Sequence, residues 1–120
     1  MNESYNKLVR DKIPEHLDTK GISYEQSTAT VKEWGERCLK KLEEEVREFL
    51  EAGDIEELAD ILEIIDEIKK LPEFANVEEV RKKKLEEKGG FEKRIILKRK
   101  NSLNINMSTV ITTVNIVDTR

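Results

Sequence analysis

The sequence predicts an all-α protein built on an antiparallel pair of helices over residues 30–52 and 54–71. In both ranges apolar residues recur at the spacing of one helix face, and each range opens with a helix-capping pattern. Only two prolines, five glycines and six aromatic residues occur among the 120 residues. That composition is poor for a sandwich or a barrel, whose strands and turns are rich in such residues, so we expect helices throughout the main body.

The helix pair is expected to complete its core with a second copy of the chain. Apolar residues make up 37% of the sequence and charged residues 40%, which argues against a large core within one chain. A single helix hairpin cannot bury the apolar faces of both its helices. We therefore predict a homodimer with a four-helix-bundle core and leave a tetramer open as the alternative.

Turn and capping residues place the N-terminal helices. Pro14 suits the first turn of a short helix that runs to about Thr19, and residues 22–28 are expected to form a loop or a short extended piece. The sequence Thr-Val-Lys-Glu at 30–33 matches a capping box, and Gly53 is a natural stop for the long helix that follows.

Two further helices follow from the same residue types. Asp54 begins the second long helix, which should end before Pro72. Because the turn before Asp54 is so short, the two long helices must run antiparallel. Asn76 begins a third, basic helix that stops at the glycine pair 89–90, and residues 91–97 are expected to be extended.

The last twenty residues differ in character from the rest of the chain. Residues 101–120 are rich in Asn, Thr, Ile and Val and almost uncharged, which suits a β-strand or an appended tail. We assign residues 1–100 to one domain and leave the role of 101–120 open.

Several classes of protein and of chemistry are not expected. No run of about 18 apolar residues occurs, so we predict no membrane-spanning helix, and the N-terminus shows no secretory leader. We therefore expect a cytoplasmic protein without a membrane partner. Cys38 is the single cysteine and His16 the single histidine, which excludes an internal disulfide and leaves little basis for His-dependent nucleophilic catalysis.

The charge is distributed unevenly along the chain. Residues 1–80 hold 11 basic and 22 acidic side chains, a net charge of −11, whereas residues 81–100 hold ten basic and three acidic ones, a net charge of +7. This division suits a protein that binds a metal ion and an anion together. The alternative hypothesis is a non-enzymatic helical module that binds nucleic acid or an acidic partner through segment 81–100.

On each long helix, carboxylates lie within or beside the apolar face that is expected to be buried. Measured from the centre of the apolar arc of the first helix, Glu45 lies at about −60° and Glu48 at about −120°. In the second helix Glu57 lies at about −40° and Asp60 at about −100°. Clustered carboxylates at the edge of a core are costly unless a positive charge compensates them.

A divalent cation is the compensation that the sequence favours. Lys41 is the only basic residue near these acids on the first helix. Each carboxylate alone would more often be a solvated boundary residue, but the four together form an all-oxygen set without His or usable Cys. Such a set suits Mg²⁺, with Mn²⁺ as the alternative.

The same residues resemble a known metal-binding signature. The sequence Glu-Glu-Val-Arg-Glu at 44–48, followed by Glu-Leu-Ala-Asp at 57–60, is similar to that of the MazG-like all-α nucleotide pyrophosphohydrolases. The segment Tyr-Asn-Lys-Leu-Val-Arg-Asp-Lys-Ile-Pro at 5–14 resembles the opening of the phosphoribosyl-ATP pyrophosphohydrolase-like subgroup, and the blocks at 57–63 and 88–91 are placed as in that subgroup. The resemblance spans about residues 5–97.

The resemblance implies hydrolysis of a nucleoside triphosphate, or a related nucleotide, to the monophosphate and pyrophosphate. It implies that Mg²⁺ is held by Glu45, Glu48, Glu57 and Asp60. Glu44 would lie beside them as an outer group or water activator, so that Glu44, Glu45 and Glu48 are the predicted catalytic residues. A magnesium ion that keeps open positions binds phosphate oxygens and activates water without a histidine.

A polyphosphate substrate also needs cations, because the acidic face would repel it. The candidates are Arg10 and Lys12 in the N-terminal block and Lys84 and Lys88 before the glycine pair. Each has a plainer alternative, since Arg10 and Lys12 can pair with surface acids and the lysines near 84 can form a solvated face.

The sequence does not identify which nucleotide is the substrate or whether the protein hydrolyses it. Only eight residues separate Glu48 from Glu57, fewer than in typical MazG domains, so the loop that faces the substrate is short. No residue identifies a base pocket. A third hypothesis keeps the fold and the metal but makes the protein a nucleotide sensor without turnover.

Overall fold

The computed structural model describes residues 6–101, and within them the chain is helical. The elements, in chain order, are α1 (Ile13–Thr19), α2 (Val31–Ala52), α3 (Ile55–Lys69), the 3₁₀ helix η1 (Pro72–Phe74) and α4 (Val77–Lys88). No strand occurs between residues 6 and 101. The all-α prediction is confirmed for this part of the chain, and the predicted strand or tail at 101–120 lies outside it except for residue 101.

Helix α2 has the ends that its sequence predicts. The Thr30 hydroxyl accepts a hydrogen bond from the Glu33 backbone N–H at 3.2 Å, and the Glu33 carboxylate accepts one from the Thr30 N–H at 2.9 Å, which completes the capping box. Gly53 ends the helix in the left-handed region, with φ of 66°, and donates its N–H to the Phe49 carbonyl.

Helix α3 begins as predicted and ends two residues early. The Asp54 carboxylate accepts a hydrogen bond from the Glu57 N–H at 3.0 Å. The helix ends at Lys69 rather than at residue 71, because Pro72 restricts the residue before it to the extended region, where Leu71 lies with φ of −67° and ψ of 137°. Pro72 then opens η1, which the sequence did not predict.

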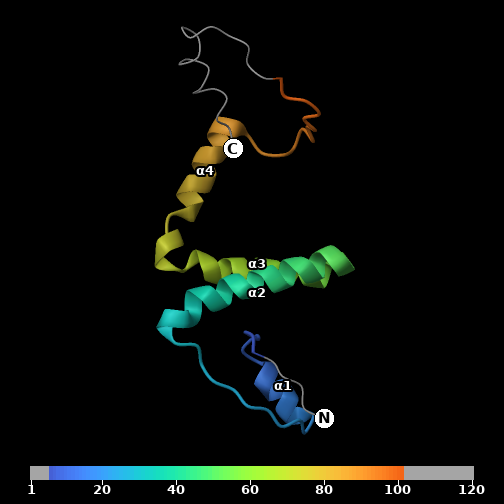
Figure 1. Cartoon of the computed structure of the whole chain (residues 1–120), viewed down its shortest axis with the longest axis vertical. Coiled ribbons are helices and arrows are strands. Elements are labelled where there is room, and N and C mark those ends of the chain that lie inside the picture. The colour runs from blue at the N-terminus through green and yellow to red at the C-terminus, as the bar shows by residue number, and fades with distance from the viewer. Residues whose placement is uncertain (1–5, 102–120) are drawn as a thin grey trace. The chain divides into compact units, whose positions relative to one another are not determined.

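Helices α2 and α3 lie side by side and run in opposite directions (Figure 1). Few apolar side chains are buried: among the described residues they are Cys38 on α2, Ile64 on α3 and Leu71, which follows α3. The burial of Cys38 raises the pKa of its thiol, with the Glu67 charge adding to the effect.

Apolar side chains also remain exposed along one line of each long helix. On α3 they recur at steps of three and four residues, and the exposed set on this helix is Ile55, Leu58, Leu62 and Ile65. On α2 the exposed set includes Leu39, Val46 and Leu50. We call these seven residues the exposed apolar stripes.

The chain divides after Ala75 into two compact units, and the second contains α4. Its helix follows Asn76 and is stopped at Gly89, with φ of 79°, as the sequence predicts, although the Asn76 side chain makes no capping bond. All residues of α4 are exposed. The segment 91–97 begins with a turn, in which the Arg94 N–H bonds to the Phe91 carbonyl at 3.0 Å, and continues without helix or strand.

None of the helices in residues 6–101 combines the length and the apolar character that crossing a bilayer requires.

Gly35 gives a test of the packing between α2 and α3. A Cβ built on this residue would lie 3.9 Å from Leu71 Cδ1, an ordinary van der Waals contact, and the position is helical. Gly35→Ala is therefore expected to raise the free energy of unfolding by about 0.5–1 kcal/mol, since alanine loses less backbone entropy in a helix than glycine does. Urea denaturation at fixed protein concentration measures the difference.

Gly53→Ala is the matched control. No atom would crowd a Cβ at this position either, but its left-handed backbone is strained for alanine, so the same assay should show a loss of about 1–2 kcal/mol. A destabilised Gly35→Ala would contradict the packing described here.

Candidate metal centre

Five carboxylates converge where the second half of α2 faces the first half of α3. The turn at 53–54 folds α3 back along α2 and so brings the carboxylates of its first two turns, Glu57 and Asp60, to Glu45. One triad, Glu45, Glu57 and Asp60, offers an oxygen from each residue, with these atoms all within 4.8 Å of one another. A second triad, Glu44, Glu45 and Glu48, meets the same limit. Glu45 belongs to both, and we call the five residues the carboxylate cluster.

The structure thus brings three of the four predicted metal ligands to the fourth, Glu45. Glu57 and Asp60 meet Glu45 in the first triad, and Glu48 meets it in the second together with Glu44. Carboxylates at these separations can share a hard cation such as Mg²⁺, which prefers oxygen ligands.

Glu45 is the most deeply placed member of the carboxylate cluster. The residue is only 5% exposed, and no other charged residue among those described is buried to this degree. Its Oε1 forms an ion pair with Lys41 Nζ at 3.0 Å, whereas its Oε2 is shielded from solvent and has no hydrogen-bond partner among the described residues. Glu57 Oε2 is shielded and unpartnered as well. Two unsatisfied carboxylate oxygens inside one cluster are costly and indicate a place for a cation.

Among residues 6–101, three cations contact the carboxylate cluster. Lys41 approaches from the preceding turn of α2 and also lies 3.5 Å from Glu44 Oε1. The other two come from the segment before α1: Lys7 Nζ lies 2.8 Å from Glu44 Oε1, and Arg10 Nη2 lies 2.7 Å from Asp60 Oδ1. Five carboxylates against three cations leave two negative charges, the charge that one divalent ion would balance.

The pKa of Glu57 is raised in the folded chain, where other carboxylates lie close to it. Burial raises the pKa of its carboxyl above the usual value, and the neighbouring carboxylates, Glu48 foremost, raise it further. A cation bound between them would reverse that repulsion.

The pKa of Glu44 moves in the other direction. Burial is the largest single influence and acts upward, but the ion pairs with Lys7 and Lys41 outweigh it, so the pKa of Glu44 is lowered. Glu44 is therefore already compensated by lysines, which fits an outer position better than direct metal coordination.

The four predicted substrate-binding cations are divided between the two units of the chain. Arg10 lies at the carboxylate cluster through its bond to Asp60, which is the pairing with an acid that the sequence offered as the alternative to substrate binding. Lys12 caps α1 through its backbone, is exposed, and makes no side-chain bond to another residue of the described range 6–101. Lys84 and Lys88 lie on α4 in the second unit, and their relation to the carboxylate cluster stays a prediction.

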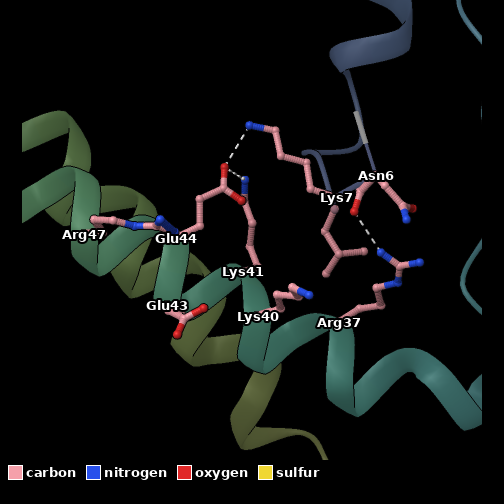
Figure 2. A pocket seen from close by; sticks show the side chains of 9 residues that line it. Asn6, Lys7, Arg37, Lys40, Lys41, Glu43, Glu44 and Arg47 are labelled. Carbon is pink, nitrogen blue, oxygen red and sulfur yellow. Dashed lines mark hydrogen bonds and ion pairs between the residues drawn. The ribbon is translucent and has the colours of Figure 1, made fainter. Parts of the chain in front are cut away.

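Some basic residues near the cluster were missed from the sequence. Lys7 lies in the same N-terminal block as Arg10 and Lys12, and only the fold brings it to Glu44. Arg37, Lys40 and Arg47 line a pocket beside Glu44 (Figure 2). Their recurrence along one helix is visible in the sequence, but a solvated face of a highly charged helix has the same pattern, so it does not identify a pocket.

Comparisons with known protein families, with curated proteins and with solved structures gave no match to this chain.

Glu57→Gln is expected to stabilise the metal-free protein at neutral pH. Because the pKa of Glu57 is raised by folding, its ionisation costs more in the folded than in the unfolded chain, and glutamine mimics the neutral acid. The gap in melting temperature between variant and wild type should open as the pH rises above the ordinary glutamate value of 4.5, and it should close below that value. Thermal unfolding in EDTA at a series of pH values measures it.

Glu56→Gln, on the exposed side of the same helical turn, is the control and should show no such pH-dependent gain. Melting temperatures of Glu57→Gln that match the wild type throughout the pH range would contradict a crowded carboxylate cluster.

Proposed function

We propose that the protein is a Mg²⁺-dependent nucleotide pyrophosphohydrolase that converts a nucleoside triphosphate, or a related nucleotide, to the monophosphate and pyrophosphate. The observation that carries the proposal is Glu45, a nearly buried carboxylate with one unpartnered oxygen, at the point where two carboxylate triads meet. The resemblance of the blocks at 5–14, 44–48 and 57–60 to the MazG-like enzymes supports the same reaction.

The donor set fits magnesium. All the available ligand atoms are carboxylate oxygens, and the described part of the chain places no histidine or thiol among them. Glu45, Glu48, Glu57 and Asp60 would hold the ion. When bound there, Mg²⁺ would neutralise charge on phosphate oxygens and lower the pKa of a coordinated water.

Other residues of the chain would activate water and bind the phosphates. Glu44, held by Lys7 and Lys41, lies next to Glu45 and Glu48 and is placed to orient a water molecule or accept its proton. Arg10, bonded to Asp60, brings a guanidinium to the edge of the metal position, where it can donate to a phosphate. Lys12, Lys84 and Lys88 remain candidate substrate ligands on the basis of the resemblance alone.

The proposal includes association of two copies of the chain through the exposed apolar stripes. The exposed apolar stripes recur at three, four or seven residues, as in a coiled-coil seam, and Leu50, Ile55 and Leu62 are 60–81% exposed in the single chain. Side chains of this size favour burial, and a second helix pair packed on the stripes would form a four-helix core. We therefore propose a homodimer, with a tetramer as the alternative.

Glu48→Gln tests the catalytic part of the proposal. The change removes one negative ligand without changing side-chain size, so pyrophosphate release from a panel of nucleoside triphosphates at fixed Mg²⁺ should fall about 100-fold or more, the order expected when several kcal/mol of charge stabilisation are lost. Replacing Mg²⁺ by EDTA should abolish release by the wild type.

Glu51→Gln, one turn further along α2 and exposed, is the control and should keep full activity. Equal activity of wild type and Glu48→Gln would remove the proposed mechanism. Magnesium- and nucleotide-dependent thermal stabilisation without any product would instead identify a nucleotide sensor.

Leu62→Glu tests the dimer. A charge in the middle of the α3 stripe would be buried in a four-helix core, so the variant should sediment as a monomer under conditions in which the wild type is a dimer. Glu51→Gln should behave as the wild type in the same sedimentation-equilibrium experiment. A wild type that stays monomeric at high concentration would contradict self-association.

A further inference from the structure

A pocket of about 210 Å³ lies between the N-terminal segment 6–8 and one face of α2. Figure 2 shows its lining side chains, with Lys7 and Lys41 directed to the Glu44 carboxylate. The residues that line it are Asn6, Lys7, Leu8, Arg37, Lys40, Lys41, Glu43, Glu44 and Arg47.

The pocket carries an excess of positive charge. Five of its nine lining residues are basic and two are acidic. Such a concentration of cations in a concave surface favours an anionic ligand, in a unit of the chain that is otherwise strongly acidic.

Several of these cations keep donors to spare. Lys40 and Arg47 make no hydrogen bond or ion pair with any residue in the described range 6–101. Arg37 donates one bond, from Nη1 to the Asn6 carbonyl at 2.9 Å, and a guanidinium has five N–H groups. The bond to Asn6 also fixes the N-terminal segment that forms the opposite wall of the pocket.

The size of the pocket selects the kind of anion. Its volume is below the roughly 300–1,000 Å³ of sites that enclose a whole small-molecule ligand, so a nucleoside would not be enclosed with its phosphates. Phosphate groups need little room and many donors. Glu44 belongs both to the pocket lining and to the carboxylate cluster, so an anion bound here lies next to the metal position.

We propose that this pocket binds the pyrophosphate moiety, as free pyrophosphate or as the end of a polyphosphate chain, through Arg37, Lys40 and Arg47. For the end of a polyphosphate chain the inference rests on the proposed function. Binding of free pyrophosphate does not require turnover. Lys7 contributes to the same anion site from the N-terminal segment while its ion pair with Glu44 links that site to the carboxylate cluster.

Calorimetric titration of the full-length protein with inorganic pyrophosphate at fixed free Mg²⁺ tests the proposal. Lys40→Gln and Arg47→Gln should each weaken binding about tenfold, because each removes one charge-assisted donor. Neither side chain holds other described residues in place, so both variants should fold. Lys32→Gln, an exposed lysine on α2 outside the pocket, should bind as the wild type does.

Two comparisons identify the ligand. Sulfate offers a single tetrahedral anion and should bind far more weakly than pyrophosphate; equal affinities would overturn the proposal. If the polyphosphate chain uses the same pocket, adding Lys40→Gln or Arg47→Gln to the Glu48→Gln variant should weaken its binding of a nucleoside triphosphate as much as each change weakens pyrophosphate binding. Losses with free pyrophosphate but not with the nucleotide would refute the pocket as part of the substrate site.

The outcomes separate this inference from the proposed function. Hydrolysis that depends on Glu48, together with pyrophosphate binding that is indifferent to Lys40 and Arg47, would overturn the anion pocket alone. Pyrophosphate binding that depends on Lys40 and Arg47, without hydrolysis of any nucleotide, would support the anion pocket and overturn the enzyme.

Discussion

The structure of the first unit depends on the electrostatics of carboxylates that are drawn between two packed helices. A short turn, fixed by Gly53 and Asp54, forces α3 back along α2, and the register of that return brings Glu57 and Asp60 to Glu45. The apolar core between the helices is small, so little hydrophobic stabilisation is available to offset this repulsion. Positive charge must therefore be supplied at the same place.

The chain supplies part of that charge from its own N-terminal segment. Lys7 and Arg10 reach carboxylates that lie 37 and 50 residues further along the sequence, and Lys41 reaches Glu45 from within α2. These contacts leave the oxygens at the centre of the cluster, Glu45 Oε2 and Glu57 Oε2, without partners. A cluster whose outer carboxylates are paired with basic side chains, and whose remaining oxygens still lack positive charge, suits one small, doubly charged cation. The cationic pocket shares Glu44 with the carboxylate cluster, so the proposed anion site would lie beside the proposed metal site.

Much of this could be predicted from the sequence, because local rules determine it. The capping box at Thr30, the left-handed stop at Gly53 and the cap at Asp54 each act within a few residues, and all three occur as expected. Helical geometry placed Glu45 within the apolar arc, and the structure finds it buried. Helix α3 ends two residues before its predicted end, because Pro72 holds Leu71 in the extended region although the apolar pattern of the helix continues to that residue.

The remainder depends on contacts between distant parts of the chain, which no local pattern encodes. The N-terminal block suggested cations near the acids, but the pairing of Arg10 with Asp60 and of Lys7 with Glu44 requires α1 and the segment after it to bring that block back to α2 and α3. The basic pocket was hidden for a different reason: Arg37, Lys40 and Arg47 look like ordinary surface residues of a highly charged helix until the N-terminal segment provides the facing wall. Lys84 and Lys88 belong to the second unit, so their part in any site stays a prediction.

The presence of a cation site between α2 and α3 is tested most directly by titrating the protein with Mn²⁺ and following the electron paramagnetic resonance signal of the free ion. The signal should be lost as the ion binds the wild type, Mg²⁺ should restore it by competition, and Glu45→Gln should bind Mn²⁺ at least about tenfold more weakly because a charged ligand is removed. A free-ion signal that is undiminished by wild-type protein at millimolar concentration would show that the carboxylates converge without holding a metal.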